Sequence, residues 1–108
     1  LVTGLFTLHE MPPYLRPKVM QEAVRVLKPG GRILLSDYGP RPPHSLLGWI
    51  AKGVAFTFEM LAGGDHFKNY RDFLNRQALP PLIAGQRLVV KSKATAAGGN
   101  VALYLLSA

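Results

Sequence analysis

The segment that most constrains the fold of this chain is residues 24–38, which read Val-Arg-Val-Leu-Lys-Pro-Gly-Gly-Arg-Ile-Leu-Leu-Ser-Asp-Tyr. Pro29 cannot continue a helix, and the two glycines after it can adopt the left-handed backbone angles that end a helix and turn the chain. Ile33, Leu34 and Leu35 then form an apolar run without alternation, which is typical of a strand covered on both faces by helices. The segment therefore predicts a helix end, a sharp turn and a buried parallel strand.

The residues before this turn predict the first half of a βαβ unit. Residues 1–8 are largely apolar and indicate a buried strand, and Pro12 and Pro13 suit the opening turn of a helix. The apolar residues of that helix recur at helical spacing and should form its buried face; they are Leu15, Val19, Ala23 and Val26 or Leu27. Strand, helix and strand together predict two parallel strands joined by a right-handed crossover.

Two further helices are expected after the second strand. Ser45 can cap an apolar helix over residues 46–62, and Asp65 can cap a second helix that begins at His66 and ends near residue 78. After that helix, two consecutive prolines predict an interruption and a short turn.

The end of the chain predicts a hairpin. In residues 87–93 basic and polar residues alternate with apolar ones, which indicates a strand near a sheet edge with one face in water. Residues 101–106 read instead as a nearly continuous apolar strand after a Gly-Gly-Asn turn. Because the last strand is the more apolar, we expect it to be inserted between the edge strand and the parallel core.

The length and composition of the chain limit the class of protein to which it can belong. A chain of 108 residues with 48% apolar composition can form one domain over residues 1–108 with an ample core. The absence of cysteine excludes a disulfide framework and a thiolate metal site, and it fits a cytoplasmic location. Residues 45–62 contain Lys52 and Glu59 and fall short of the about 20 clean apolar residues of a membrane helix, so no stable membrane span is expected.

The charge balance is basic, with 13 Lys and Arg against 6 Asp and Glu and a formal net charge of +7. Such a balance raises nucleic acid or an anionic surface as a partner. The basic residues are scattered singly between Arg16 and Lys93, however, which favours a solvated basic surface and predicts no nucleic-acid partner. A basic interaction or nucleic-acid-binding module without catalysis is the alternative function.

Polar side chains follow both predicted parallel strands. His9 and Glu10 come directly after the first strand, and Asp37 and Tyr38 end the second. Ligands of open α/β sheets bind at the carboxyl ends of the strands, so these residues are candidates for a site. For His9 the competing interpretation is a histidine that orders the loop, and for Asp37 a carboxylate that accepts from nearby loop amides.

A second group of candidates lies in the helix predicted after Asp65. His66 and Tyr70 are one helical turn apart, so both can face one ligand, and Arg71 could contact an anionic one. The alternative is that Tyr70 belongs to the core while His66 and Arg71 are exposed. The three histidines of the chain have no paired spacing, so no metal site is expected.

The chain resembles a known family at two places. Residues 25–32 (Arg-Val-Leu-Lys-Pro-Gly-Gly-Arg), between strands that end in Leu8-His9-Glu10 and in Asp37-Tyr38, look like the C-terminal half of a class I S-adenosylmethionine-dependent methyltransferase. Residues 63–74 (Gly-Gly-Asp-His-Phe-Lys-Asn-Tyr-Arg-Asp-Phe-Leu) are similar to a segment of a bacterial small-molecule branch of the quinone-biosynthesis type. The resemblance covers essentially the whole chain.

The resemblance implies a Rossmann-like α/β sheet of seven strands, of which this chain would hold the fourth to seventh, with the seventh antiparallel between the fifth and sixth. It implies S-adenosyl-L-methionine as cofactor and a small-molecule methyl acceptor as substrate. Carried over residue by residue, the catalytic candidates are His9 and Asp37. The cofactor-binding candidates are Thr7, Leu8, His9 and Glu10. The substrate-binding candidates are Tyr38, His66, Tyr70 and Arg71.

The family's glycine-rich cofactor loop and the acidic residue that holds the ribose are missing from the sequence. The glycine pair at residues 30–31 precedes a strand, whereas the family's loop follows one. We therefore expect those elements to lie before Leu1 and the fragment to be inactive alone. The strand at residues 1–8 would then expose its inner edge, which allows a homodimer through that edge or aggregation.

Overall fold

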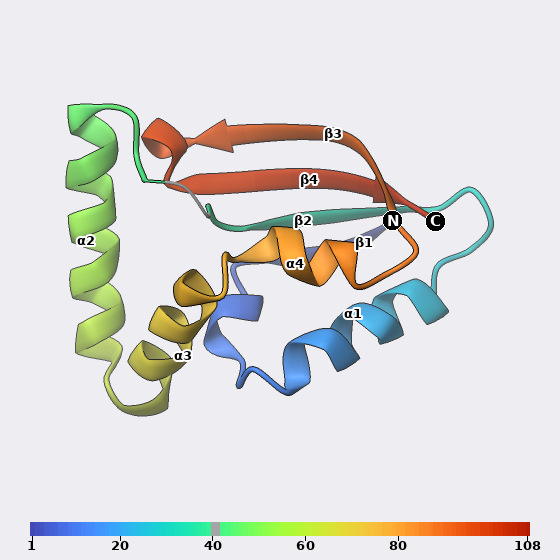
Figure 1. The fold of residues 1–108 in the computed structure, drawn as a ribbon, viewed down its shortest axis with the longest axis horizontal. Helices are drawn as coiled ribbons and strands as arrows, with labels where there is room; N and C mark the ends of the chain where they lie inside the picture. Colours follow the sequence, from blue (N-terminus) through green and yellow to red (C-terminus); the bar gives the residue numbers. More distant parts are fainter. Residues whose placement is uncertain (40–41) are drawn as a thin grey trace.

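The computed structural model describes residues 1–39 and 42–108, which form a mixed α/β fold around one four-stranded sheet (Figure 1). The strands are β1 (Val2–Leu5), β2 (Arg32–Tyr38), β3 (Val89–Ala96) and β4 (Val101–Ser107). The helices are α1 (Leu15–Arg25), α2 (Leu46–Ala62), α3 (Gly64–Asn75) and α4 (Leu79–Ala84), with single 3-10 turns η1 (Leu8–Glu10) and η2 (Ala97–Gly99).

The sheet has the strand order β1-β2-β4-β3. β1 and β2 are parallel, with Val2 opposite Ile33, and β4 is antiparallel to both of its neighbours. The prediction that the last strand of the hairpin lies between the edge strand and the parallel core is therefore confirmed. In the part of the chain that the structure describes, β1 pairs with β2 alone, so its other edge is open.

The turn between α1 and β2 has the predicted form. Gly30 has a φ of 76°, the left-handed conformation that glycine adopts without strain. A Cβ atom on Gly31 would lie 2.8 Å from the backbone carbonyl oxygen of Lys28, which the tight turn holds in place, so a larger residue does not fit there. The helix end, the turn and the strand follow one another as the sequence predicts.

The core lies between the sheet and helices α1, α3 and α4, which Figure 1 shows on one side of it. Ile33 and Leu35 of β2 and Leu106 of β4 are buried against these helices. Leu34 and Leu105 are only half-buried, so the prediction that helices cover both faces of β2 is wrong for the described chain. The side chains of a strand alternate between its faces, and only one face has helices packed on it.

The predicted bounds of two elements need correction. The first strand ends at Leu5 and is followed by the η1 turn instead of continuing to residue 8. α3 begins at Gly64 with Gly63 as its N-cap and ends at Asn75, so Asp65 lies in its first turn and is not the cap.

The predicted interruption is present, but it falls at residues 76–78, between α3 and α4, and not at the two prolines, which lie in the first turn of α4. Proline is tolerated in that turn because its missing N–H has no intrahelical partner there.

β3 lies at the edge of the sheet, as predicted, but all of its residues are exposed, so neither face is buried.

The buried face of α1 also differs from the prediction. Val19 is exposed, whereas Met20 and the charged Arg16 are almost fully buried. The helix is rotated so that Arg16 points into the protein, where it finds the polar partners described below.

α2 begins as predicted at Ser45, whose Oγ accepts a hydrogen bond from the backbone N–H of Gly48 at 3.0 Å. Its first turn packs closely on η2, because a Cβ atom on Gly48 would lie 2.8 Å from the carbonyl oxygen of Gly98. No helix in the described residues is long and apolar enough to cross a membrane.

Candidate functional site

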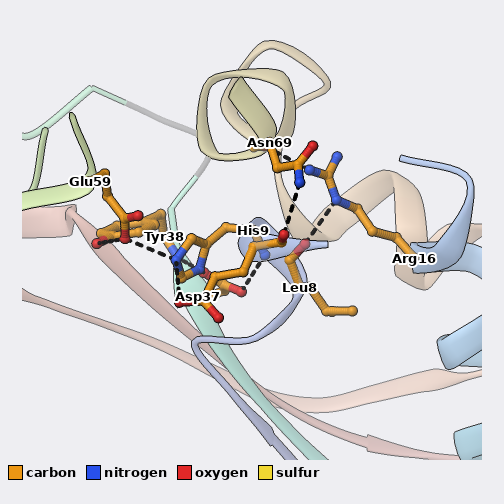
Figure 2. A network of polar contacts seen from close by, with 8 residues as sticks. Leu8, His9, Arg16, Asp37, Tyr38, Glu59 and Asn69 are labelled. Atoms are coloured by element: carbon orange, nitrogen blue, oxygen red, sulfur yellow. Dashed lines mark hydrogen bonds and ion pairs between the residues drawn. The ribbon is translucent and has the colours of Figure 1, made fainter. Parts of the chain in front are cut away.

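A buried polar cluster forms where the carboxyl ends of β1 and β2 meet (Figure 2). His9, in the η1 turn after β1, lies beside Asp37 near the end of β2. The His9 Nδ1 atom is 2.7 Å from Asp37 Oδ1, and the backbone N–H of His9 donates to Asp37 Oδ2 at 3.2 Å. Both side chains are almost fully buried. Parallel pairing of β1 and β2 brings together these two residues, which the sequence separates by 28 positions.

Glu59 of α2 completes the cluster. Its Oε1 atom lies 3.0 Å from His9 Nε2 and accepts a hydrogen bond from the Tyr38 hydroxyl at 3.1 Å. Sequence reasoning missed Glu59 as a site residue. The available signal was its position as the single carboxylate within an otherwise apolar helix, a place where a charge is costly unless it is paired.

The neighbouring carboxylates of Asp37, Glu59 and Glu10 shift the pKa of His9. Burial alone would lower its pKa, but the hydrogen bond to Asp37 and the charges of the neighbouring carboxylates outweigh burial and raise the pKa above the ordinary value of 6.5. In the protonated form both ring nitrogens donate, one to Asp37 and one to Glu59. The carboxylates of Asp37, Glu59 and Glu10, whose Oε1 atom lies 3.9 Å from His9 Nε2, thus favour the protonated form of His9.

Aromatic rings surround the imidazole of His9. The ring centroid of Tyr38 lies 4.8 Å away, and those of Tyr70, Phe73 and Phe6 lie 6.1, 6.3 and 6.4 Å away, all edge-to-face. Burial, together with the charge of Glu59, raises the pKa of Tyr38 and of Tyr70. Both phenols therefore stay neutral at physiological pH.

Arg16 fixes the turn that carries His9. Its Nε donates to the carbonyl of Leu8 at 2.8 Å, its Nη2 to the carbonyl of Asn69 at 2.7 Å, and its Nη1 to Asp72 at 2.7 Å. The amide of Asn69 donates in turn to the carbonyl of Glu10 at 3.0 Å. Arg16 belonged to the basic residues expected on the surface, and that expectation is wrong for it. Its buried guanidinium joins α1, η1 and α3 through two backbone carbonyls and one carboxylate. Backbone carbonyls occur at every residue, so the sequence gives no signal for these bonds.

The structure places only some of the substrate-binding residues predicted from the resemblance beside His9. Tyr38 and Tyr70 contact each other and His9, with 4.9 Å between their ring centroids. His66 and Arg71 are exposed, with Arg71 over the ring of Phe67.

The cofactor-binding candidates next to His9 in the sequence also differ, in this case in their burial. Leu8 is buried in the core, whereas the side chains of Thr7 and Glu10 are exposed.

The cluster is closed in this arrangement. A cavity of about 390 Å³ has Arg16 and Phe73 in its lining but not His9, Asp37 or Glu59. Among the described residues no group of three or more His, Cys, Asp or Glu side chains has the geometry of a metal site. What the cluster can do chemically is to hold a proton, orient one imidazole and tie α2 to the sheet.

Comparison of the chain with protein-family models and with curated proteins finds no match.

Proposed function

We propose that the chain is the C-terminal part of a class I S-adenosylmethionine-dependent methyltransferase with a small-molecule acceptor. The observation that carries the proposal is the strand order β1-β2-β4-β3, with β4 antiparallel between β2 and the edge. In a simple meander β3 would pair with β2, because sequential strands usually lie side by side. The inserted β4 is the arrangement expected for strands four to seven of that methyltransferase sheet.

The position of the polar cluster also supports the proposal. His9 and Asp37 lie at the carboxyl ends of the two parallel strands, the edge of an α/β sheet at which ligands bind. In the proposal His9 and Asp37 are the polar pair nearest the reaction, and Tyr38 and Tyr70 form an aromatic wall for the acceptor. Thr7, Leu8 and Glu10 stay candidates for cofactor contact, as do His66 and Arg71 for acceptor contact.

The charge of His9 defines its proposed role. Methyl transfer to a hydroxyl or an amine requires a group that takes the acceptor's proton. His9 can do so only after it has lost its own proton, and its raised pKa moves that event to higher pH. Asp37 acts as a positioning residue, because it accepts from both the ring and the backbone N–H of His9.

The described residues do not by themselves fit the cofactor. The space around His9 is filled by Asp37, Glu59 and the aromatic rings, and the chain has no glycine-rich loop after a strand. In the proposal, the cofactor pocket is therefore formed only when the preceding strands of the methyltransferase sheet are present.

Calorimetric titration with S-adenosylhomocysteine tests the proposal. We expect no binding by the 108-residue chain and micromolar binding by a chain extended through the coding sequence upstream of Leu1. In the extended chain the variant Asp37→Asn should weaken binding or turnover, whereas Asp65→Asn, which changes an exposed carboxylate, serves as the matched control. Failure of the extended chain to bind would reject the proposal.

A further inference from the structure

A surface helix usually turns its apolar face to the core and its polar face to water, and α2 has the opposite arrangement. Its outward face consists of Leu46, Leu47, Ile50, Val54, Phe58 and Leu61, which recur three, four and seven residues apart; we call these six residues the outer face. Each is at least half exposed, and four of them are 69% exposed or more. The side that turns to the protein has Gly48, which is buried, and the charged Glu59.

The outer face has no unsatisfied polar group. The charged residues of α2 are both engaged elsewhere: Glu59 binds His9 and Tyr38, and the ammonium of Lys52 lies 5.9 Å from the ring of Trp49. Thr57, whose position falls within this face, donates its hydroxyl to the carbonyl of Gly53 at 2.9 Å. The outer face itself is therefore almost entirely apolar and favours an apolar partner.

The outer face forms one continuous apolar stripe. It runs over the whole length of α2, from Leu46 to Leu61, and the exposed side chains of Trp49 and Met60 lie at its margins. Contiguous exposed apolar surface of this kind marks an interaction site more often than single exposed residues do. Figure 1 shows α2 standing at the end of the molecule, with the sheet and the other helices on one side of it. The outer face is therefore open to a flat, extended apolar partner.

The distribution of charge favours an anionic partner. Five of the six acidic side chains are engaged by cations or by His9; they are Glu10, Glu22, Asp37, Glu59 and Asp72. The exposed charge of the protein is consequently cationic, and Lys68 and Arg71 are exposed on α3, which packs against α2. Two copies of a chain with a net charge of +7 repel each other, whereas an anionic bilayer attracts the chain.

We propose that the outer face of α2 binds to the surface of an anionic lipid bilayer. A helix of 17 residues is about 25 Å long, and it is not a candidate to cross the membrane, so α2 lies in the plane of the interface. The apolar side chains enter the boundary between headgroups and acyl chains, and the cations of α3 contact the anionic headgroups. This inference is independent of the proposed methyltransferase activity.

Trp49 provides a direct test, because it is the single tryptophan of the chain and lies at the margin of the outer face. Its fluorescence is measured as the 108-residue chain is titrated with vesicles of equimolar phosphatidylglycerol and phosphatidylcholine. We expect a blue shift, co-flotation with the vesicles and weaker binding at high salt. Vesicles of phosphatidylcholine alone should bind at least roughly tenfold more weakly.

Matched variants separate lipid binding from a change in folding. Leu47→Ser combined with Leu61→Ser should weaken partitioning by at least roughly tenfold, because two exposed leucines leave the interface. Val89→Ser, at a comparably exposed position on β3, should leave partitioning unchanged. Circular dichroism checks that all variants keep the fold. The proposal would be overturned if anionic vesicles caused no blue shift. It would also be overturned if the shift needed no lipid and grew with protein concentration, or if duplex DNA produced it.

Discussion

The imidazole of His9 and the carboxylate of Asp37 are joined at 2.7 Å, and the same carboxylate accepts the backbone N–H of His9 at 3.2 Å. Asp37 therefore fixes both the position of the η1 turn and the orientation of the ring. Glu59 approaches the opposite nitrogen from α2 at 3.0 Å. One imidazole thus connects the ends of β1 and β2 to a helix that otherwise contacts the fold mainly through η2 and α3.

The stability of the protein should fall as His9 loses its proton. Because the pKa of His9 is raised in the folded state, its contribution is fully present below the ordinary pKa of 6.5 and is lost as pH rises through the folded pKa. Urea unfolding measured between about pH 5.5 and pH 9 should show this loss. The variant His9→Gln should flatten the dependence, and NMR titration should give His9 a pKa above the ordinary value of 6.5. An unchanged slope in His9→Gln would contradict the assignment.

Replacing Glu59 by glutamine should lower the pKa of His9, because one of the three carboxylates that raise it loses its charge. The shape of the side chain is kept, so we expect a loss of about 1–2 kcal/mol in the free energy of unfolding below pH 6.5 and a smaller loss above it. NMR titration and urea unfolding measure the two effects. Asp65→Asn, an exposed carboxylate in α3, is the control and should change neither.

Arg16 should contribute much more to stability than Arg76, although both pair with Asp72. Arg16→Met leaves the carbonyls of Leu8 and Asn69 without their donor in a buried region, which should cost about 3–5 kcal/mol. Arg76→Met removes an exposed partner of Asp72 and should cost less than about 1 kcal/mol. Thermal and urea unfolding compare the two variants. Equal losses would mean that the buried bonds of Arg16 contribute little.

Two glycines of α2 should respond oppositely to alanine. A Cβ atom at Gly48 would lie 2.8 Å from the Gly98 carbonyl, so Gly48→Ala has to displace η2 and should cost at least about 2 kcal/mol. Gly53 meets nothing within 4 Å, and Gly53→Ala should stabilise the helix by about 0.5–1 kcal/mol. Urea unfolding of the pair measures both effects. A loss in Gly53→Ala like that in Gly48→Ala would show that α2 does not hold the position described.

Part of the site could be predicted from the sequence. The polar residues after two apolar strands indicated His9, Asp37 and Tyr38, because parallel strands end at one edge. Glu59 and Arg16 could not be predicted, because each depends on which side of its helix turns inward. Val19 and Arg16 lie three residues apart on α1, and the periodicity favoured the apolar residue. Three hydrogen bonds, formed with groups on two other elements, favour the burial of Arg16.

The sequence by itself determined the local elements: the turn at Pro29 and Gly30, the cap at Ser45, the extent of α2 and the insertion of β4. These depend on backbone restrictions and on apolar patterns that act over a few residues. Only the tertiary structure decided the partners of His9 and the outward direction of the most apolar face of α2. A side chain's partners are set by how elements distant in the sequence pack together, and local patterns contain no information on that packing.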